Sequence, residues 1–146
     1  MARIGKWTKI YLDDSGGTAR DLSTDLTDID GLPLTADEIE VGGYTQDKQY
    51  LAGRQDSQIT LTGNFTTTAS TGTHTVISGV NNNNTVCTLT VQKGDNATPT
   101  SGDPEFEGEF IVMNYTPKPD LNGSMTFTVN LRPAYGQSIP TWGTVA

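Results

Sequence analysis

The strongest constraint on the fold comes from two adjoining segments near the C-terminus, 105–115 and 124–131. In the second segment, apolar side chains occupy every other position, at Met125, Phe127, Val129 and Leu131. Alternation with period two is typical of a β-strand that buries one face. The intervening residues, 116–123, contain prolines and an Asn-Gly step, which interrupt a strand and favour a turn. The two segments are therefore predicted to form an antiparallel hairpin.

The 105–115 segment has one face typical of a core, made of Phe106, Gly108, Phe110 and Val112. Its other face changes character along the strand, with Glu105, Glu107 and Glu109 followed by Ile111, Met113 and Tyr115. A strand that faced only water and core would keep polar residues outward throughout. We therefore expect the apolar half of this face to contact either a local sheet layer or another subunit.

The same kind of pattern predicts further strands at 7–12, 18–23, 57–65 and 85–93. The turn between the first two contains two adjacent glycines, which adopt left-handed conformations readily. On the third strand, Gly63 falls on the inward face, where a bulge or a close neighbour is expected.

One short helix is predicted at 71–80. Val76, Ile77 and Val80 share one of its faces, and a Ser or Thr before the segment is expected to cap it. Because it is short, it needs a sheet to pack against. With the strands, it makes a single, mainly β domain that spans 1–146.

Three segments lack a clear alternation or helical spacing of apolar residues. Residues 25–40 are acidic and contain helix and strand breakers, which predicts a solvated loop; the alternative, a calcium loop, fails the EF-hand template at both ends. Residues 42–55 are predicted to form a long loop, with a short edge strand at 44–51 as the alternative. The tail, 134–146, is predicted to be irregular, with Trp142 docked on the domain.

Composition narrows the classes of function. The formal net charge is -8, with 17 acidic and 9 basic residues. Direct wrapping of nucleic acid relies on clustered Lys and Arg, so this charge balance disfavours it. The single cysteine, Cys87, excludes an intramolecular disulfide. No apolar run reaches the length of a membrane span, and residues 1–7 lack the apolar region of a secretory signal, so a cytosolic product is expected.

No group of residues points clearly to catalysis. A nucleophilic dyad would have to combine Cys87 with His74, but Cys87 is expected to point into the core, where a thiol is inert. The three glutamates at 105–109 stand about 6.5–7 Å apart on one strand face, a spacing that glycosidases use. A plain charged face explains them more simply. No phosphate-binding glycine motif occurs, and we predict no enzyme activity, cofactor or metal site.

Two stretches stand out, EVGGYTQDKQYLAGRQDSQITLTGNF at 40–65 and FEGEFIVMNYTPKPDLNGSMTFTVNLRPAYGQSIPTWGTV at 106–145. They resemble the tail tube (major tail) proteins of long-tailed bacteriophages or of a related gene transfer agent. The helix THTVISGV between them lies where that family has its single helix. Together the stretches cover about half of the chain.

The resemblance implies a β-sandwich or partly closed barrel of about seven or eight antiparallel strands with one short flanking α-helix. It also implies homo-hexameric rings that stack into a tube in a virion tail, made in the host bacterial cytoplasm. Tail tip, tail terminator and tape measure proteins would be the partners. DNA would pass through without specific binding, and no membrane would be involved.

Two sets of site residues follow. The loop at 42–54, with a Gly-Gly hinge and aromatic anchors, is predicted to be mobile in the free subunit and to connect rings. The predicted inter-ring or subunit interface comprises Tyr44, Gln46, Asp47, Lys48, Tyr50, Leu51, Arg54, Ile111, Met113 and Tyr115. An acidic wall would repel DNA, so Glu105, Glu107, Glu109 and Asp56 are predicted to line the lumen. The alternative is that these glutamates face the outer solvent.

The main alternative function is a carbohydrate- or peptide-binding β-sandwich module, and an acidic-site hydrolase ranks after it. Binding modules of that kind usually display a row of exposed aromatic residues, whereas the aromatic residues of this chain are dispersed.

Overall fold

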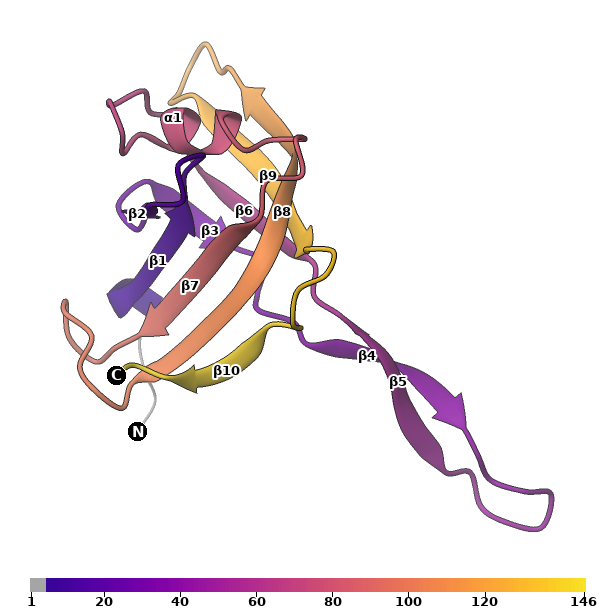
Figure 1. Ribbon diagram of the computed structural model, residues 1–146. Helices are drawn as coiled ribbons and strands as arrows, with labels where there is room; N and C mark the ends of the chain where they lie inside the picture. Colours follow the sequence, from indigo (N-terminus) through magenta and orange to yellow (C-terminus); the bar gives the residue numbers. More distant parts are fainter. Residues whose placement is uncertain (1–4) are drawn as a thin grey trace.

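The computed structural model describes residues 5–146 and shows a strongly curved β-sheet from which a long hairpin projects (Figure 1). The main sheet contains β1 (Thr8–Asp13), β2 (Ala19–Asp21), β3 (Leu26–Ile29), β6 (Ile59–Asn64), β7 (Cys87–Lys93), β8 (Pro104–Lys118), β9 (Thr126–Pro133) and β10 (Thr141–Thr144). The projecting hairpin consists of β4 (Thr35–Glu40) and β5 (Tyr50–Asp56). A short 3-10 turn, Gly5–Trp7, precedes β1, and the α-helix of the described residues is α1 (Thr73–Ser78).

The order of the strands explains why the sheet curls. It runs β2-β1-β7-β8-β9-β6-β3, with β10 beside the first half of β8, and every pairing between these strands is antiparallel. Strands lie about 4.8 Å apart, so a flat sheet of seven strands would separate β2 from β3 by about 29 Å. Only residues 22–25 join these two strands, and a chain of that length spans at most about 18 Å. The sheet therefore folds round one core without closing into a barrel, which confirms the predicted fold class.

The core forms where the alternating patterns predicted it. Phe106, Phe110 and Val112 of β8 are at most 1% exposed, as are Phe127 and Leu131 of β9. Residues from β1, β6 and β7 complete the same cluster. The predicted helix is shorter than its sequence pattern, but Val76, Ile77 and Val80 are buried under the sheet as expected.

The expected side-chain cap of the helix is absent. Gly72 occupies the N-cap position and makes no capping side-chain bond. Thr73 instead connects α1 to the end of β6: its hydroxyl donates to the carbonyl oxygen of Asn64 over 2.7 Å and accepts from the amide of Thr66 over 3.1 Å. The hydroxyl therefore orients the helix on the sheet.

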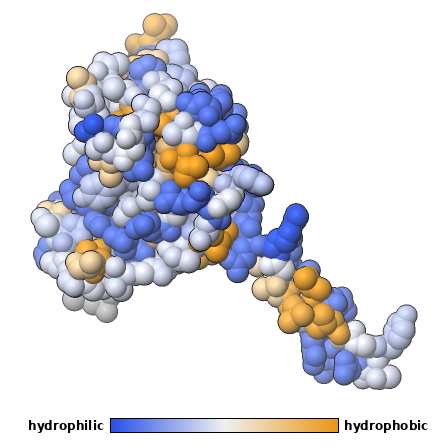
Figure 2. Space-filling model, viewed as in Figure 1, coloured by the Kyte–Doolittle hydropathy of each residue, from blue (hydrophilic) through white to orange (hydrophobic). Residues whose placement is uncertain are grey.

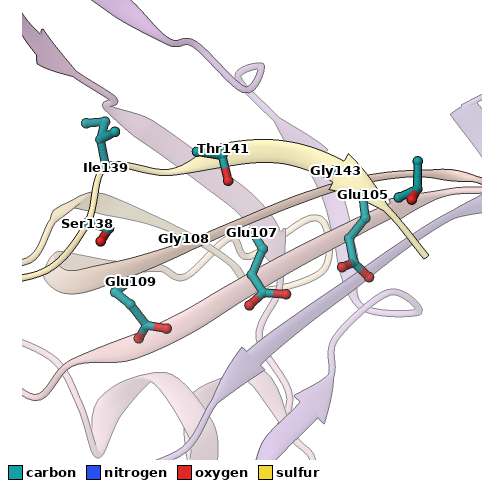
Figure 3. Close-up of a pocket in the computed structure, with 9 residues that line it drawn as sticks. Glu105, Glu107, Gly108, Glu109, Ser138, Ile139, Thr141 and Gly143 are labelled. Atoms are coloured by element: carbon teal, nitrogen blue, oxygen red, sulfur yellow. The ribbon is translucent and has the colours of Figure 1, made fainter. Parts of the chain in front are cut away.

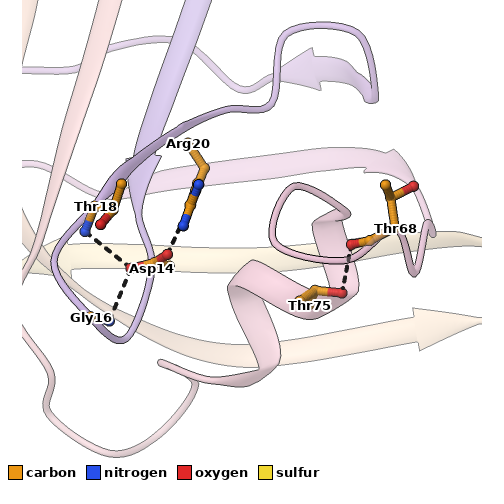
Figure 4. A network of polar contacts seen from close by, with 6 residues as sticks. All are labelled: Asp14, Gly16, Thr18, Arg20, Thr68 and Thr75. Atoms are coloured by element: carbon orange, nitrogen blue, oxygen red, sulfur yellow. Dashed lines mark hydrogen bonds and ion pairs between the residues drawn. The ribbon is translucent and has the colours of Figure 1, made fainter.

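Gly63 behaves as predicted, and of the two glycines in the β1–β2 turn Gly17 adopts the left-handed conformation, with φ 81°. Gly63 lies in close contact with its neighbour strand, because a Cβ there would stand 2.7 Å from the carbonyl oxygen of Asp25. The β1–β2 turn is organised by Asp14, whose carboxylate accepts from the amides of Gly16 and Thr18 and pairs with Arg20 over 2.8 Å (Figure 4). The Arg20 hydrogen bond, followed by that of Thr18, lowers the pKa of Asp14.

One predicted strand face is corrected by a bulge in β8. Asn114 has φ 59°, and the pairing with β9 moves from Met113 opposite Asn130 to Thr116 opposite Thr128. β8 therefore contains one extra residue, and such an insertion turns every following side chain to the other face. Side-chain oxygens of the Asn81–Asn82 turn accept the amides on both sides of the bulge, which stabilises it.

Tyr115 consequently does not share a face with Ile111 and Met113. Its ring packs against Phe127, with the ring centroids 5.5 Å apart, and its hydroxyl lies 3.0 Å from Nδ1 of His74. Tyr115 therefore packs against the core of its own subunit, and its predicted part in a subunit interface stays a prediction.

The segments predicted to be irregular contain short strands. Residues 25–40 include β3 and β4, the loop predicted at 42–55 is confined to 41–49, and the tail contains β10. Each of these strands is short or, like β4 and β10, exposed along its whole length. Such strands lack a single buried face, and it is this face that produces a visible alternation of apolar and polar residues in a sequence.

Candidate interaction surfaces

The projecting hairpin has one apolar face without a partner. Ile39 of β4 pairs directly with Leu51 of β5, and Val41 follows on the same face. We call these three residues the hairpin apolar face; their exposed fractions are 47%, 59% and 49%. Figure 2 shows the corresponding apolar patch midway along the projection. A two-stranded hairpin in water is marginally stable by itself, so this face needs cover.

The opposite face of the hairpin has different chemistry. Glu38 and Glu40 lie on it, with Tyr50 paired to Glu40. Nearer the body, the apolar side ends at Asp37, which lies beside Ile39 and contacts Arg54 at 3.9 Å; both side chains are strongly exposed. The hairpin is thus amphipathic, with an apolar side and an acidic side.

The tip of the hairpin is a compact turn. The amide of Gly43 donates to Oε1 of Gln46 over 3.0 Å, and the amide of Gln46 donates back to the carbonyl of Gly43. A Cβ at Gly42 would lie 2.6 Å from the carbonyl oxygen of Asp47, so glycine permits a close approach of the chain here. Tyr44 points fully into solvent.

The structure brings most of the predicted interface residues together and separates others. Tyr44, Gln46, Asp47, Lys48, Tyr50 and Leu51 all lie at the distal end of the hairpin. Ile111 and Met113 are half-buried on the outer face of β8, in the body. Sequence reasoning missed Ile39 and Val41, although the run Glu-Ile-Glu-Val at 38–41 carried the period-two signal.

A second surface lies on the outer face of β8. Glu105, Glu107 and Glu109, which we call the acidic strip, project from the same side of the strand (Figure 3). They border an open groove of about 320 Å³ whose other wall comes from the tail, at residues 138–144. β10 forms part of this wall because it pairs with β8.

The carboxylates of the acidic strip have polar neighbours on β7. Glu109 accepts from the hydroxyl of Thr88 over 2.8 Å, and Glu105 accepts from Nε2 of Gln92 over 2.7 Å. Burial raises the pKa of Glu107, and the charges of Glu105 and Glu109 raise it further. The strip is therefore a concentration of negative charge on one face of β8.

Asp56 lies apart from the acidic strip, at the root of the hairpin. Its Oδ2 is 2.8 Å from Nη2 of Arg132 on β9, and its Oδ1 accepts the amide of Ser57 over 2.8 Å. Arg132 offsets the charge of Asp56, and the predicted place of Asp56 in the lumen stays a prediction.

Other kinds of site have little support. Among residues 5–146, no group of three or more His, Cys, Asp and Glu is arranged to hold a metal ion. No helix in that range has the length and hydrophobicity that a membrane span requires. The exposed aromatic residues Tyr44, Tyr135 and Trp142 lie on three separate elements, and no observation favours the carbohydrate-binding alternative.

Comparison with known proteins gives matches at the level of structure. No protein-family model and no curated protein sequence matches the chain. A chain from the tail of an empty gene transfer agent particle, solved with C6 symmetry, matches with TM-score 0.69 and 19% identity over 99% of this chain and 100% of that one.

Two further matches come from contractile systems. A chain from the sheath–tube complex of the extracellular contractile injection system PVC matches with TM-score 0.70 and 14% identity, over 99% of this chain and 93% of that one. A chain from the six-fold symmetrised baseplate of the anti-feeding prophage matches with TM-score 0.72 and 10% identity, over 98% and 96%. The resemblance to tail tube proteins is thereby confirmed for the fold.

Proposed function

We propose that this chain is a structural subunit of a tail tube, which forms hexameric rings that stack into a conduit for DNA. The observation that carries the proposal is the amphipathic hairpin, which leaves the body with an uncovered apolar face. The fold supports it, because matching chains come from the tail of a gene transfer agent with six-fold symmetry and from contractile injection systems. The proposed role is mechanical rather than catalytic.

The hairpin serves as the connector between rings. The hairpin projects from the body (Figure 1), Tyr44, Tyr50 and Leu51 are exposed near its distal end, and the hairpin apolar face supplies area to bury. Covering a half-exposed aliphatic side chain contributes roughly 1 kcal/mol. A ring presents one hairpin per subunit, so these small contributions add up around the ring.

Ring closure uses the sides of the body. β2, β3 and β10 are edge strands of the main sheet, and an unpaired edge is a template for another chain. Pairing of edges between neighbours would satisfy these groups, and a head-to-tail contact whose rotation closes yields a ring. Ile111 and Met113, half-buried on the outer face of β8, are placed to join such a lateral contact.

The acidic strip lines the lumen in this proposal. A basic wall would hold DNA through phosphate contacts, whereas carboxylates repel it over a Debye length of about 8–10 Å. Replacing Glu105, Glu107 and Glu109 by lysine should preserve assembly and slow DNA ejection. Particles that eject at the wild-type rate would place the strip on the outer surface instead.

The partners and location follow from the same proposal. The subunit is made in the bacterial cytoplasm, assembles in the virion tail, and meets tail tip, tail terminator and tape measure proteins at the ends and in the lumen of the tube. Matching chains occur in a tube-terminating cap and in a sheath/tube terminator assembly, which supports contacts of this kind.

Negative-stain imaging and light scattering of purified protein test the proposal. Wild-type protein should form rings or tubes, and the double variant Ile39→Thr/Leu51→Thr should remain folded but fail to extend tubes. Threonine keeps the β-propensity of both positions. Ala52→Thr, on the opposite face of the same hairpin, is the matched control and should assemble normally. A wild-type protein that stays monomeric at every concentration and salt would refute the tube.

A further inference from the structure

The hairpin is attached to the body through very little structure. β4 and β5 pair with each other and with no strand of the main sheet. The chain enters the hairpin through residues 30–34 and leaves it at Asp56 and Ser57. The direction in which the hairpin points must therefore be set by contacts at this junction.

Asp56 is the central residue of the junction. Its carboxylate pairs with Arg132 of β9 over 2.8 Å and accepts the amide of Ser57 over 2.8 Å. Its carbonyl oxygen accepts from the hydroxyl of Thr35, the residue opposite it on β4, over 3.1 Å. One residue thus joins both strands of the hairpin to the side of the main sheet.

One backbone hydrogen bond also ties the entry segment to β6, from the amide of Asp30 to the carbonyl oxygen of Thr60 over 2.9 Å. Within residues 5–146, Ser57 Oγ and Arg132 Nε are buried and have no hydrogen-bond partner. Arg132 is thus held at the junction by a single charged contact, from Nη2 to Asp56. An ion pair with both side chains about half exposed adds little to global stability. Here it joins two elements that share no backbone pairing, so its main effect is on their relative orientation.

We propose that Asp56 and Arg132 are positioning residues that fix the angle at which the hairpin leaves the body. The consequence for seating the hairpin on a neighbouring ring rests on the proposed function, whereas the angle itself is a property of the isolated subunit. The role differs from the lumen position that the sequence suggested for Asp56.

Distance measurement between two spin labels tests the angle. Labels are placed at Tyr44→Cys on the hairpin tip and at Thr128→Cys on β9, both at exposed positions. Cys87 is left in place, because it is buried and its pKa is raised to about 11, which keeps it unreactive in the folded protein. The variants are Arg132→Gln and Asp56→Asn.

The wild type should give one narrow distance distribution. Both variants should broaden or shift this distribution. The population of hairpin orientations other than the main one should rise about two- to fivefold, which is the change in equilibrium expected when a partly exposed ion pair is lost. Arg54→Gln is the matched control, because it breaks the Asp37 pair inside the hairpin, and it should leave the distribution unchanged. The exchanged pair Asp56→Arg/Arg132→Asp should restore a narrow distribution. Unchanged distributions in Arg132→Gln and Asp56→Asn, with circular dichroism confirming the fold, would overturn the proposal.

Tube assembly of the same variants separates this inference from the proposed function. If the wild-type protein forms tubes and the label distances are unchanged in Arg132→Gln and Asp56→Asn, the positioning role is refuted and the proposed tube function stands. Broadened distances in variants of a protein that never assembles would support the positioning role and refute the tube.

Discussion

Gly108 of β8 is a position at which one added methyl group should loosen the tail from the sheet. Gly108 lies on the core face, and the ring of Pro140 packs directly on it. An ideal Cβ at Gly108 would stand 2.6 Å from Cβ and Cγ of Pro140 and 2.9 Å from Cε2 of Phe110. The substitution Gly108→Ala therefore requires the proline ring to move away by nearly 1 Å.

The magnitude follows from two opposing effects. Overpacking a well-filled site costs about 1–3 kcal/mol, and replacing glycine by alanine regains about 0.4–1 kcal/mol by restricting the unfolded chain. The net loss is about 1–2 kcal/mol, or roughly 2–8 °C in Tm for a chain of this size. Pro140 directly precedes β10, where Trp142 packs edge-on against Phe106 at 5.3 Å. The displacement should thus spread into β10.

Calorimetry and hydrogen exchange measure both effects. Gly108→Ala should lower Tm and speed exchange of the β10 amides. Gly143→Ala is the matched control, because this glycine lies in β10 with nothing within 4 Å of its ideal Cβ. The control should be neutral or slightly stabilising. If Gly108→Ala is as stable as Gly143→Ala and its β10 amides exchange no faster, the close contact with Pro140 does not hold the tail.

Three further predictions concern single side chains. Because burial and neighbouring carboxylates raise the pKa of Glu107 above 4.5, the folded state holds its proton to higher pH than the unfolded state. The free energy of unfolding should therefore fall as pH rises from about 4.5 through the raised pKa of Glu107. In melting experiments at several pH values, Glu107→Gln should raise Tm at pH 7 but not below pH 4. An equal gain at both pH values would contradict this. Tyr115→Phe removes the hydrogen bond to His74 and should lower Tm by about 2–4 °C, corresponding to about 1 kcal/mol; an unchanged melting curve would show that this bond contributes nothing net. Burial and nearby carboxylates raise the pKa of Cys87 to about 11. Mass spectrometry should therefore show no reaction of Cys87 with iodoacetamide at pH 7 until urea unfolds the protein. Rapid labelling of the folded protein would refute its burial.

The parts of the fold that could be predicted from the sequence are those with one buried face. β8 and β9 were recognisable because apolar residues recur on one face of each strand, and Phe106, Phe110, Phe127 and Leu131 all reach the same core. The bulge could not be predicted in this way. It depends on Asn114 adopting a positive φ and on side-chain oxygens from the distant Asn81–Asn82 turn. That dependence on residues far apart in the sequence is why Tyr115 was assigned to the wrong face.

The hairpin shows a different limit of sequence reasoning. Period-two alternation is visible when apolar residues recur against polar ones, and the run Glu38 to Val41 does alternate, but neither face of β4 is buried in the subunit. Acidic residues around it therefore favoured a solvated loop. Ile39 lies directly opposite Leu51, so the alternation gives the hairpin one apolar side, although that side is exposed in the subunit. The burial that would make this side stabilising is absent within the single chain, and the Ile39→Thr/Leu51→Thr variant tests whether a second copy supplies it.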